Sequence, residues 1–404
     1  MLRVRASGIT TQTFETLIGP RDLFDWPVMW PKVRVLYWTT TQDYLQFLCH
    51  FLTLNVRYLE IHLEGAEDEE VQEVLDLVES RCMNLVGLHL LDPETRDNEE
   101  IQDTMRQIVY NNSLTLRTLN PPQNPSPELV SDILGLPLLQ HLAMRVPQIP
   151  DRARRGILPS LEYLTFTLDE ASDLINLLSN LRKSKLIVFS MTCPYPTSDS
   201  DHAALAYFFK YAGLSSSVDE FSWRPPVSGG PPTWQFVTTL KSFANLRTLS
   251  LGMDCDEGCR FEFRHHNVVE LSRWMPRLRE LTLGGPPCPV DPGTLNIEYH
   301  TLAILAKNCP DLFLLTIHFN PGTFGFVPPH LMEPNWNVTI WSVGSIGPPR
   351  GPIDTTLFAM AVSKLFPRAT FLGTGGNPDE RWKEIHEELQ MLTLPADDGL
   401  LDLM

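Results

Sequence analysis

Leu246–Leu251 reads LRTLSL, and Leu278–Leu283 repeats the same spacing as LRELTL. Both stretches place leucines at the first, fourth and sixth positions. Alternate side chains of a strand point to opposite faces, so the fourth and sixth leucines share one apolar face and the residues between them point away. Two copies of one short phrase indicate stacked repeats that build a single shared core.

Degenerate copies of the phrase recur along the chain, at Val33–Trp38, Val56–Ile61, Leu85–Leu90, Leu116–Leu119, Leu139–Met144, Leu161–Phe166, Leu186–Phe189, Val218–Phe221, Leu312–Ile317, Val338–Ile340 and Ala369–Leu372. Their central residues are 22 (142 to 164) to 34 (281 to 315) positions apart, and helical patterns lie between them. Leucine-rich repeats have a period of about 20–29 residues. The sequence therefore predicts an α/β leucine-rich-repeat solenoid, a horseshoe with a parallel sheet on its concave face and helices on its convex face.

Four regions follow from this pattern. Residues 1–30 contain enough apolar side chains for an N-terminal cap, and 31–376 hold an irregular solenoid of about a dozen repeats. Asn377 and Pro378 begin a helix over 377–395, whose apolar residues fall on one stripe that suits a terminal cap. We expect residues 396–404 to be a flexible tail.

Composition restricts the class of partner. The net charge is −17, from 32 basic and 49 acidic residues, and such a surface repels nucleic acid and anionic membranes. The N-terminus does not read as a signal peptide, and no apolar run approaches the roughly 18 residues of a membrane span. We expect an intracellular protein, cytoplasmic or nuclear, that binds another protein.

Sites for chemistry are sparse in the sequence. Cys255 and Cys259, followed by His265 and His266, form the one metal-like constellation, but a second cysteine pair is missing. Gly373–Gly376 lacks the spacing and lysine of a phosphate loop. We therefore predict no catalytic residue, no metal and no cofactor, with a zinc- or nucleotide-dependent enzyme as the least favoured reading.

Residues between the repeat leucines define a candidate binding face. By strand alternation they point away from the core, and they are rich in aromatic, histidine and arginine side chains, which anchor many interfaces. The candidate residues are Tyr58, His62, His89, His141, Arg145, Tyr163, Glu220, Arg224, Glu280, His318 and Trp341. The alternatives are a mixed polar surface with no dedicated ligand, and a second binding rim formed by the proline-rich loops that follow the later strands.

Several phrases share a short lead-in, found at Cys82–Leu85, Leu158–Leu161, Met275–Leu278 and Cys309–Leu312. These lead-ins resemble the repeats of fungal F-box/leucine-rich-repeat proteins. The resemblance implies the substrate-recruiting subunit of a cullin–RING ubiquitin ligase, with ligase components as partners. Residues 1–30 are too short for an F-box, so only the repeat region matches. The sequence favours a protein–protein interaction scaffold, either linked to a ligase or serving as an adaptor or regulatory scaffold without that link.

Overall fold

The computed structural model divides the chain into two compact units, Met1–Leu186 and Ile187–Met404. The residues described are 2–5, 32–39, 42–91, 98–146, 158–168, 184–193, 198–211, 214–224, 233–252, 264–283, 297, 299–317, 333–342, 355–372 and 380–392.

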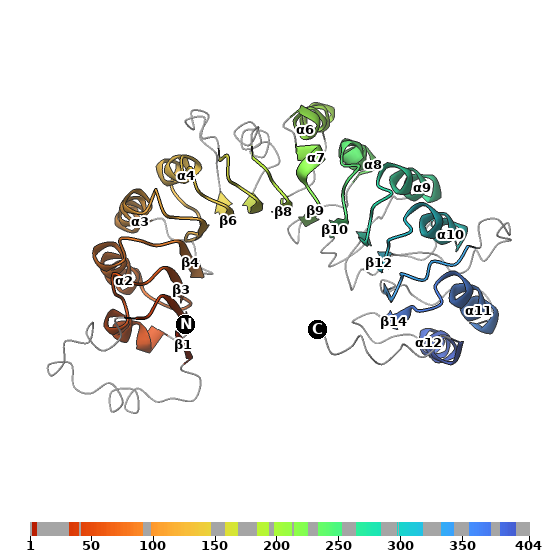
Figure 1. Cartoon of the computed structure of the whole chain (residues 1–404), viewed down its shortest axis with the longest axis horizontal. Coiled ribbons are helices and arrows are strands. Elements are labelled where there is room, and N and C mark those ends of the chain that lie inside the picture. The colour runs from red at the N-terminus through yellow and green to blue at the C-terminus, as the bar shows by residue number, and fades with distance from the viewer. Residues whose placement is uncertain are drawn as a thin grey trace. The chain divides into compact units, whose positions relative to one another are not determined.

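The first unit is a stack of parallel strands in which each strand pairs with the next one in the sequence. Helices lie on one face of this sheet and leave the other face open (Figure 1). Its strands are β1 Leu2–Arg5, β2 Val35–Thr39, β3 Tyr58–His62, β4 Gly87–Leu91, β5 Thr118–Asn120, β6 His141–Val146 and β7 Tyr163–Leu168. Its helices are η2 Gln42–His50, α2 Asp68–Arg81, α3 Glu99–Asn111 and α4 Pro127–Leu134.

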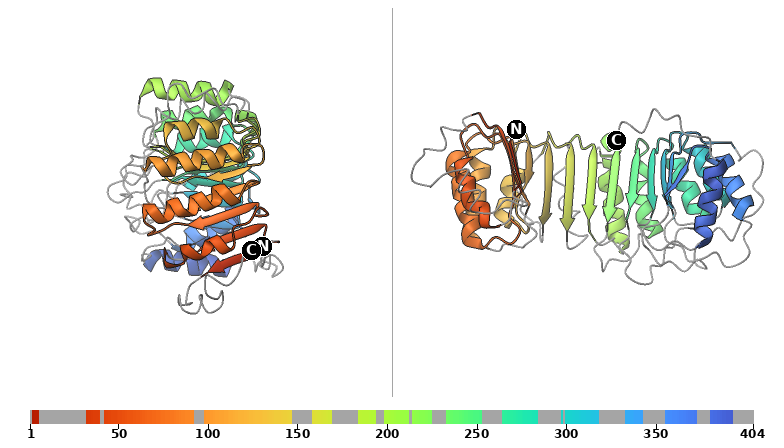
Figure 2. Two further views of the ribbon diagram at one scale, coloured as in Figure 1. Left: turned by 90° about the vertical axis from the view of Figure 1, so that its left-hand side faces the viewer. Right: turned by 90° about the horizontal axis from the view of Figure 1, so that it is seen from below.

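The second unit follows the same plan, with parallel strands side by side and helices on one face (Figure 2). Its strands are β8 Val188–Thr192, β9 Glu220–Arg224, β10 Thr248–Leu251, β11 Glu280–Leu283, β12 Leu314–Ile317, β13 Ile340–Ser342 and β14 Thr370–Leu372. Its helices are α6 Asp199–Tyr211, α7 Leu214–Ser217, α8 Trp234–Thr239, η3 Leu240–Ser242, α9 His265–Trp274, α10 Tyr299–Asn308, α11 Thr355–Leu365 and α12 Glu380–Leu392. The predicted α/β leucine-rich-repeat architecture is confirmed.

Strands β2 to β13 each begin two residues after the first apolar residue of their phrase. That first residue is buried just before the strand, as Val56 and Leu246 show. The next two amides share one acceptor on the preceding repeat: Arg57 N and Tyr58 N both donate to the Arg34 carbonyl oxygen, at 2.7 and 3.0 Å. The same pair of bonds recurs before β4 to β7 and β9 to β12, so it fixes the register at which these strands start.

Burial alternates along the strands as the leucine spacing predicts. In β3, for example, Leu59 and Ile61 are buried, whereas Tyr58 is exposed and His62 is half-buried. In the second unit phenylalanine replaces the central leucine of two phrases. Phe221 packs against Phe189, with ring centroids 5.5 Å apart, and against rings contributed by α6 and the segment after η3. The core at this position is therefore a cluster of buried aromatic rings.

Buried asparagine connects neighbouring repeats in the first unit. Asn112 follows α3 and is buried. Its Oδ1 accepts from the Leu85 amide at 2.7 Å, and its Nδ2 donates to the Ile108 carbonyl oxygen at 2.9 Å. One side chain therefore satisfies a helix end and the backbone of the preceding repeat.

The chain ends differ in detail from the expectation. Leu2–Arg5 is a strand paired with β2, although the sequence does not signal it. In α12, Ile385 and Leu389 are buried, but Leu392 is exposed, so the apolar stripe is shorter than predicted. The four predicted regions stay predictions. Gly373–Gly376, residues 396–404 and most of the proline-rich loops lie outside the described residues. No helix among the described segments is long and apolar enough to cross a membrane.

Candidate protein-binding face

The open face of the first unit carries rows of side chains that run across its strands. Register pairs Tyr58 with Gly87, Gly87 with Thr118, Thr118 with His141, and His141 with Tyr163. A second row, two residues further along each strand, places Glu60 beside His89 and His89 beside Asn120. Residues far apart in sequence therefore form one continuous polar and aromatic surface.

A glycine holds the first aromatic side chain of this face in place. A Cβ atom added to Gly87 would collide with the Tyr58 ring, 2.5 Å from Cδ1, and with the Thr118 hydroxyl. The Tyr58 ring therefore lies across β4, where a larger residue would displace it. Its side chain remains 42% exposed, which leaves one side of the ring open to a partner.

His141 and Tyr163 form a flat aromatic plate on adjacent strands. Their ring centroids are 4.1 Å apart and their planes differ by only 7°. Both residues are exposed, Tyr163 to 38%. Stacked rings lose little conformational freedom when a ligand covers them, which is a common property of interface anchors.

A group of two histidines and a carboxylate lies further along the strands, beside the row of aromatic residues. Glu60 Oε1 is 3.5 Å from His62 Nε2. Burial lowers the pKa of His89, an effect that Glu60 opposes and His141 reinforces. His89 is consequently a neutral imidazole at pH 7, able to donate one hydrogen bond and accept another.

A hollow of about 540 Å³ opens toward the ends of the same strands. Arg145 reaches across it and Nη1 donates to Gln123 Oε1 at 3.4 Å. The hollow therefore offers cationic, amide, imidazole and hydroxyl groups over an apolar floor. Its lining residues are His62, Glu64, Leu90, Leu91, Asn120, Pro121, Gln123, Ala143, Met144, Arg145, Thr165 and Thr167.

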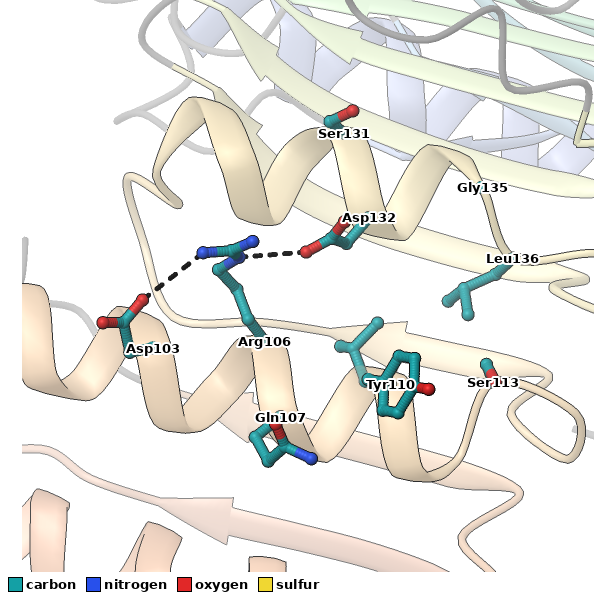
Figure 3. A pocket seen from close by; sticks show the side chains of 10 residues that line it. Asp103, Arg106, Gln107, Tyr110, Ser113, Ser131, Asp132, Gly135 and Leu136 are labelled. Carbon is teal, nitrogen blue, oxygen red and sulfur yellow. Dashed lines mark hydrogen bonds and ion pairs between the residues drawn. The ribbon is translucent and has the colours of Figure 1, made fainter.

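A second hollow, of about 500 Å³, lies on the helix side between α3 and α4 (Figure 3). Its arginine is already neutralised, because Arg106 Nε lies 2.9 Å from Asp132 Oδ2 and Nη1 lies 3.4 Å from Asp103 Oδ1. The hydrogen bond to Asp132 raises the pKa of Arg106 above its ordinary value. These groups serve helix packing first, so this hollow is the weaker candidate.

The open face of the second unit has a different character. Glu220, Thr248 and Glu280 are neighbours in register, and burial, followed by the charge of Glu220, raises the pKa of Glu280. Arg224 extends over Gly252, where an added Cβ would lie 2.9 Å from its Cγ. The row beside the glutamates carries only small hydroxyl side chains, at Ser190, Ser222, Ser250, Thr282 and Thr316.

The structure groups the predicted site residues by unit. Tyr58, His62, His89, His141, Arg145 and Tyr163 share the open face of the first unit, and Glu220, Arg224 and Glu280 share that of the second. His318 lies outside the described residues, as does the side chain of Trp341. Gln123 and the threonines of β7 were missed. Strand alternation could have identified Thr165 inside its phrase and Thr167 just after it. Gln123 lies in a loop after the weak β5 phrase, and no sequence signal pointed to it.

The metal-like constellation is described only in part. Cys255 and Cys259 lie outside the described residues. His265 Nε2 is 3.0 Å from Nε2 of His300, and its Nδ1 is 2.7 Å from the Thr301 hydroxyl. Within the described segments no group of three or more His, Cys, Asp or Glu side chains could hold a metal ion. The expectation that the chain binds no metal stays a prediction.

No protein-family model matches the sequence. No curated protein matches it at a significant level. Among solved structures, the crystal structure of the mouse RP105/MD-1 complex matches with a TM-score of 0.35 and 12% sequence identity, over 84% of this chain and 58% of that chain. So distant a likeness carries no argument, and the fold assignment rests on the strand register and burial described above.

Proposed function

We propose that this chain is a protein-interaction scaffold and that the open sheet face of the first unit binds a segment of a partner protein. The observation that carries the proposal is the exposed His141–Tyr163 plate beside a hollow that contains Arg145. Tyrosine and arginine at the edge of a preformed hollow are the usual anchors of protein interfaces. The role is binding, and the proposal includes no catalytic step.

The chemistry of this face indicates what the partner segment offers. Apolar side chains at the floor of the hollow, such as Leu90 and Met144, fit an aliphatic or aromatic residue. Arg145 and Gln123 at its wall fit a carbonyl or carboxylate oxygen. Glu220, Arg224 and Glu280 are proposed as a separate contact surface of the second unit, and His318 and Trp341 stay predictions.

Quantitative affinity capture tests the proposal. The full chain, a Tyr163→Ala/Arg145→Ala variant and a Tyr110→Ala control are immobilised and exposed to the same cell lysate. Tyr110 is the comparison because it is an exposed aromatic residue on the helix side of the same unit, where it lines the second, weaker candidate hollow. The proposal expects proteins that the control retains and the double variant loses. Equal capture by all three chains would refute it.

A narrower form of the proposal is substrate recruitment for a cullin–RING ubiquitin ligase. Its support is the lead-in motif, in which Cys82 and Cys309 are buried and their thiols point to carbonyl oxygens of the preceding repeat. Titration of the purified chain with the ligase adaptor protein tests this form. Saturable binding would support substrate recruitment for a ligase. Absence of binding would refute that narrower form, and the remaining reading would be an adaptor or regulatory scaffold that has no link to a ligase.

A further inference from the structure

We propose that a second site of the first unit, at the edge where its strands begin, binds an extended acidic segment of a partner protein. The site is a groove of about 410 Å³ lined by Arg34, Val35, Arg57, Tyr58, Val86 and Arg117. We name it the arginine groove. It goes beyond the proposed sheet-face site. The hollow of that site lies toward the other ends of the strands, and its aromatic plate stands on β6 and β7, outside the lining of the groove. Tyr58 belongs to the open face and also lines the groove.

The arginines occupy one repeat position. Each directly follows the buried first residue of its phrase, and their carbonyl oxygens accept the paired amides that begin the next strand, as at Arg34 and Arg117. Adjacent strands are about 4.8 Å apart, so the backbone positions of Arg34 and Arg57 are separated by one strand step, and Arg117 lies about 14 Å from Arg34. The backbone that presents these side chains is therefore rigid.

These arginines lack carboxylate partners among the residues that the structure describes. Arg34 and Arg117 are exposed and take part in no ion pair there, and Arg57 Nη1 donates only to the Asn84 carbonyl oxygen, at 3.0 Å. Three like charges this close repel one another, and a bound anion would relieve the repulsion. The concentration of positive charge stands out in a chain whose net charge is −17.

The second unit shows that the same position can be neutralised internally. There Arg247 follows the first leucine of its phrase, and its Nη1 lies 3.8 Å from Asp219 Oδ2, which belongs to the preceding repeat. In the first unit the residues next to these arginines at the same repeat position are arginine, valine or glutamine, and the first acidic residue at this position is Glu162. The unpaired arginines are thus a property of this groove and not of the repeat.

An apolar stripe runs beside the arginines. Leu54, Met83 and Leu114 are 62%, 44% and 76% exposed, and each lies three residues before the row residue of its repeat. The Arg57 side chain reaches the loop that carries Met83 through its bond to Asn84. Exposed apolar side chains beside cations match a partner with alternating acidic and apolar residues.

An extended peptide fits the spacing. Four residue steps of a strand span about 13 Å, close to the separation of Arg34 and Arg117, so acidic residues at alternate positions fall within reach of the arginine side chains. Carboxylate pairing with arginine is favoured because a guanidinium can bind both oxygens. The net negative charge of the chain disfavours nucleic acid as the occupant.

The test uses the full chain and a fluorescently labelled peptide of alternating glutamate and leucine, with a glutamine–leucine peptide as its control. Fluorescence anisotropy is measured for the wild type, for Arg34→Gln/Arg117→Gln and for Arg247→Gln/Arg279→Gln. Arg279 directly follows Leu278 and so holds the same repeat position as Arg247 in the second unit. We expect the first variant to weaken binding of the acidic peptide roughly tenfold, at about threefold per arginine, and the second to leave it unchanged. The Arg34→Gln/Arg117→Gln pair preserves the Arg57–Asn84 bond, so folding is retained and is checked by circular dichroism.

Salt provides a measurement that needs no variant. Raising the ionic strength from about 0.1 M to about 1 M shortens the screening length from about 10 Å to about 3 Å and should release the peptide. Equal binding of the two peptides, equal loss in both variants, or unchanged binding at high salt would each overturn the proposal. It would also be overturned if a single-stranded oligonucleotide bound more tightly than the acidic peptide and lost that binding in Arg34→Gln/Arg117→Gln.

Discussion

Replacing Asn112 by alanine should destabilise the first unit by about 2–4 kcal/mol. The substitution removes two hydrogen bonds whose other partners are the Leu85 amide and the Ile108 carbonyl oxygen. Ile108 keeps a partner, because the backbone amide of residue 112 donates to the same oxygen at 3.1 Å. The Leu85 amide loses its acceptor. An orphaned buried donor costs about 1–3 kcal/mol and a lost hydrogen bond about 1 kcal/mol, which gives the stated range.

Chemical denaturation and hydrogen exchange together measure this effect. Because each repeat contacts only its neighbours, the amides of Leu85–Leu91 should lose protection before those of the second unit. Asn111→Ala is the matched control, since its side chain makes one exposed bond, to Gln107, and should cost less than about 0.5 kcal/mol. Equal destabilisation by the two substitutions would show that Asn112 does not connect the repeats as described.

Three further predictions concern the second unit and the buried thiols. Phe221→Ala should cost about 3–5 kcal/mol in denaturant unfolding, because the ring is fully buried among other rings; a cost below about 1 kcal/mol would contradict the packing. Burial raises the pKa of Cys82 and Cys309 to about 12, so iodoacetamide at pH 8 should label them only after unfolding, as mass spectrometry can show, and equal labelling of folded protein would count against their burial. The pKa of Glu280 is raised in the folded state, so its ionised form is disfavoured there. Glu280→Gln should therefore raise the free energy of unfolding at pH 7, by an amount that fades as the pH falls through the raised pKa and is lost below about 4.5, the ordinary glutamic acid value. Urea titrations at pH 7 and below about pH 4.5 measure this difference in the free energy of unfolding. A Gln variant that is less stable than the wild type at pH 7 would contradict the prediction.

The strand positions were predictable because leucines that enter a shared core must recur at the strand period. The two-residue distance from the first apolar residue of a phrase to the start of its strand was not predictable. It depends on the carbonyl oxygen of one repeat accepting two amides of the next, as at Arg34. Leu2–Arg5 carries no leucine phrase and becomes a strand by pairing with β2, a tertiary effect.

The sequence predicted which residues lie on the candidate face, but not how their side chains are arranged there. Alternation placed Tyr58, His141 and Tyr163 on the open face, and their exposure agrees with it. The stacking of His141 on Tyr163 depends on the register of β6 and β7, and the seating of Tyr58 depends on Gly87 in the next repeat. Neither relation is visible in a sequence without the strand pairing.

The open face of the first unit is proposed to bind a protein partner through its aromatic plate and the adjoining hollow. The most direct measurement is calorimetric titration of a captured partner against the wild type, Tyr163→Ala, Arg145→Ala and Tyr110→Ala. We predict that the two substitutions on the sheet face each weaken binding about tenfold or more, and that Tyr110→Ala changes it less than about twofold. Weaker binding by Tyr110→Ala, with unchanged affinity in the other two variants, would contradict the claim and move the interface to the helix side.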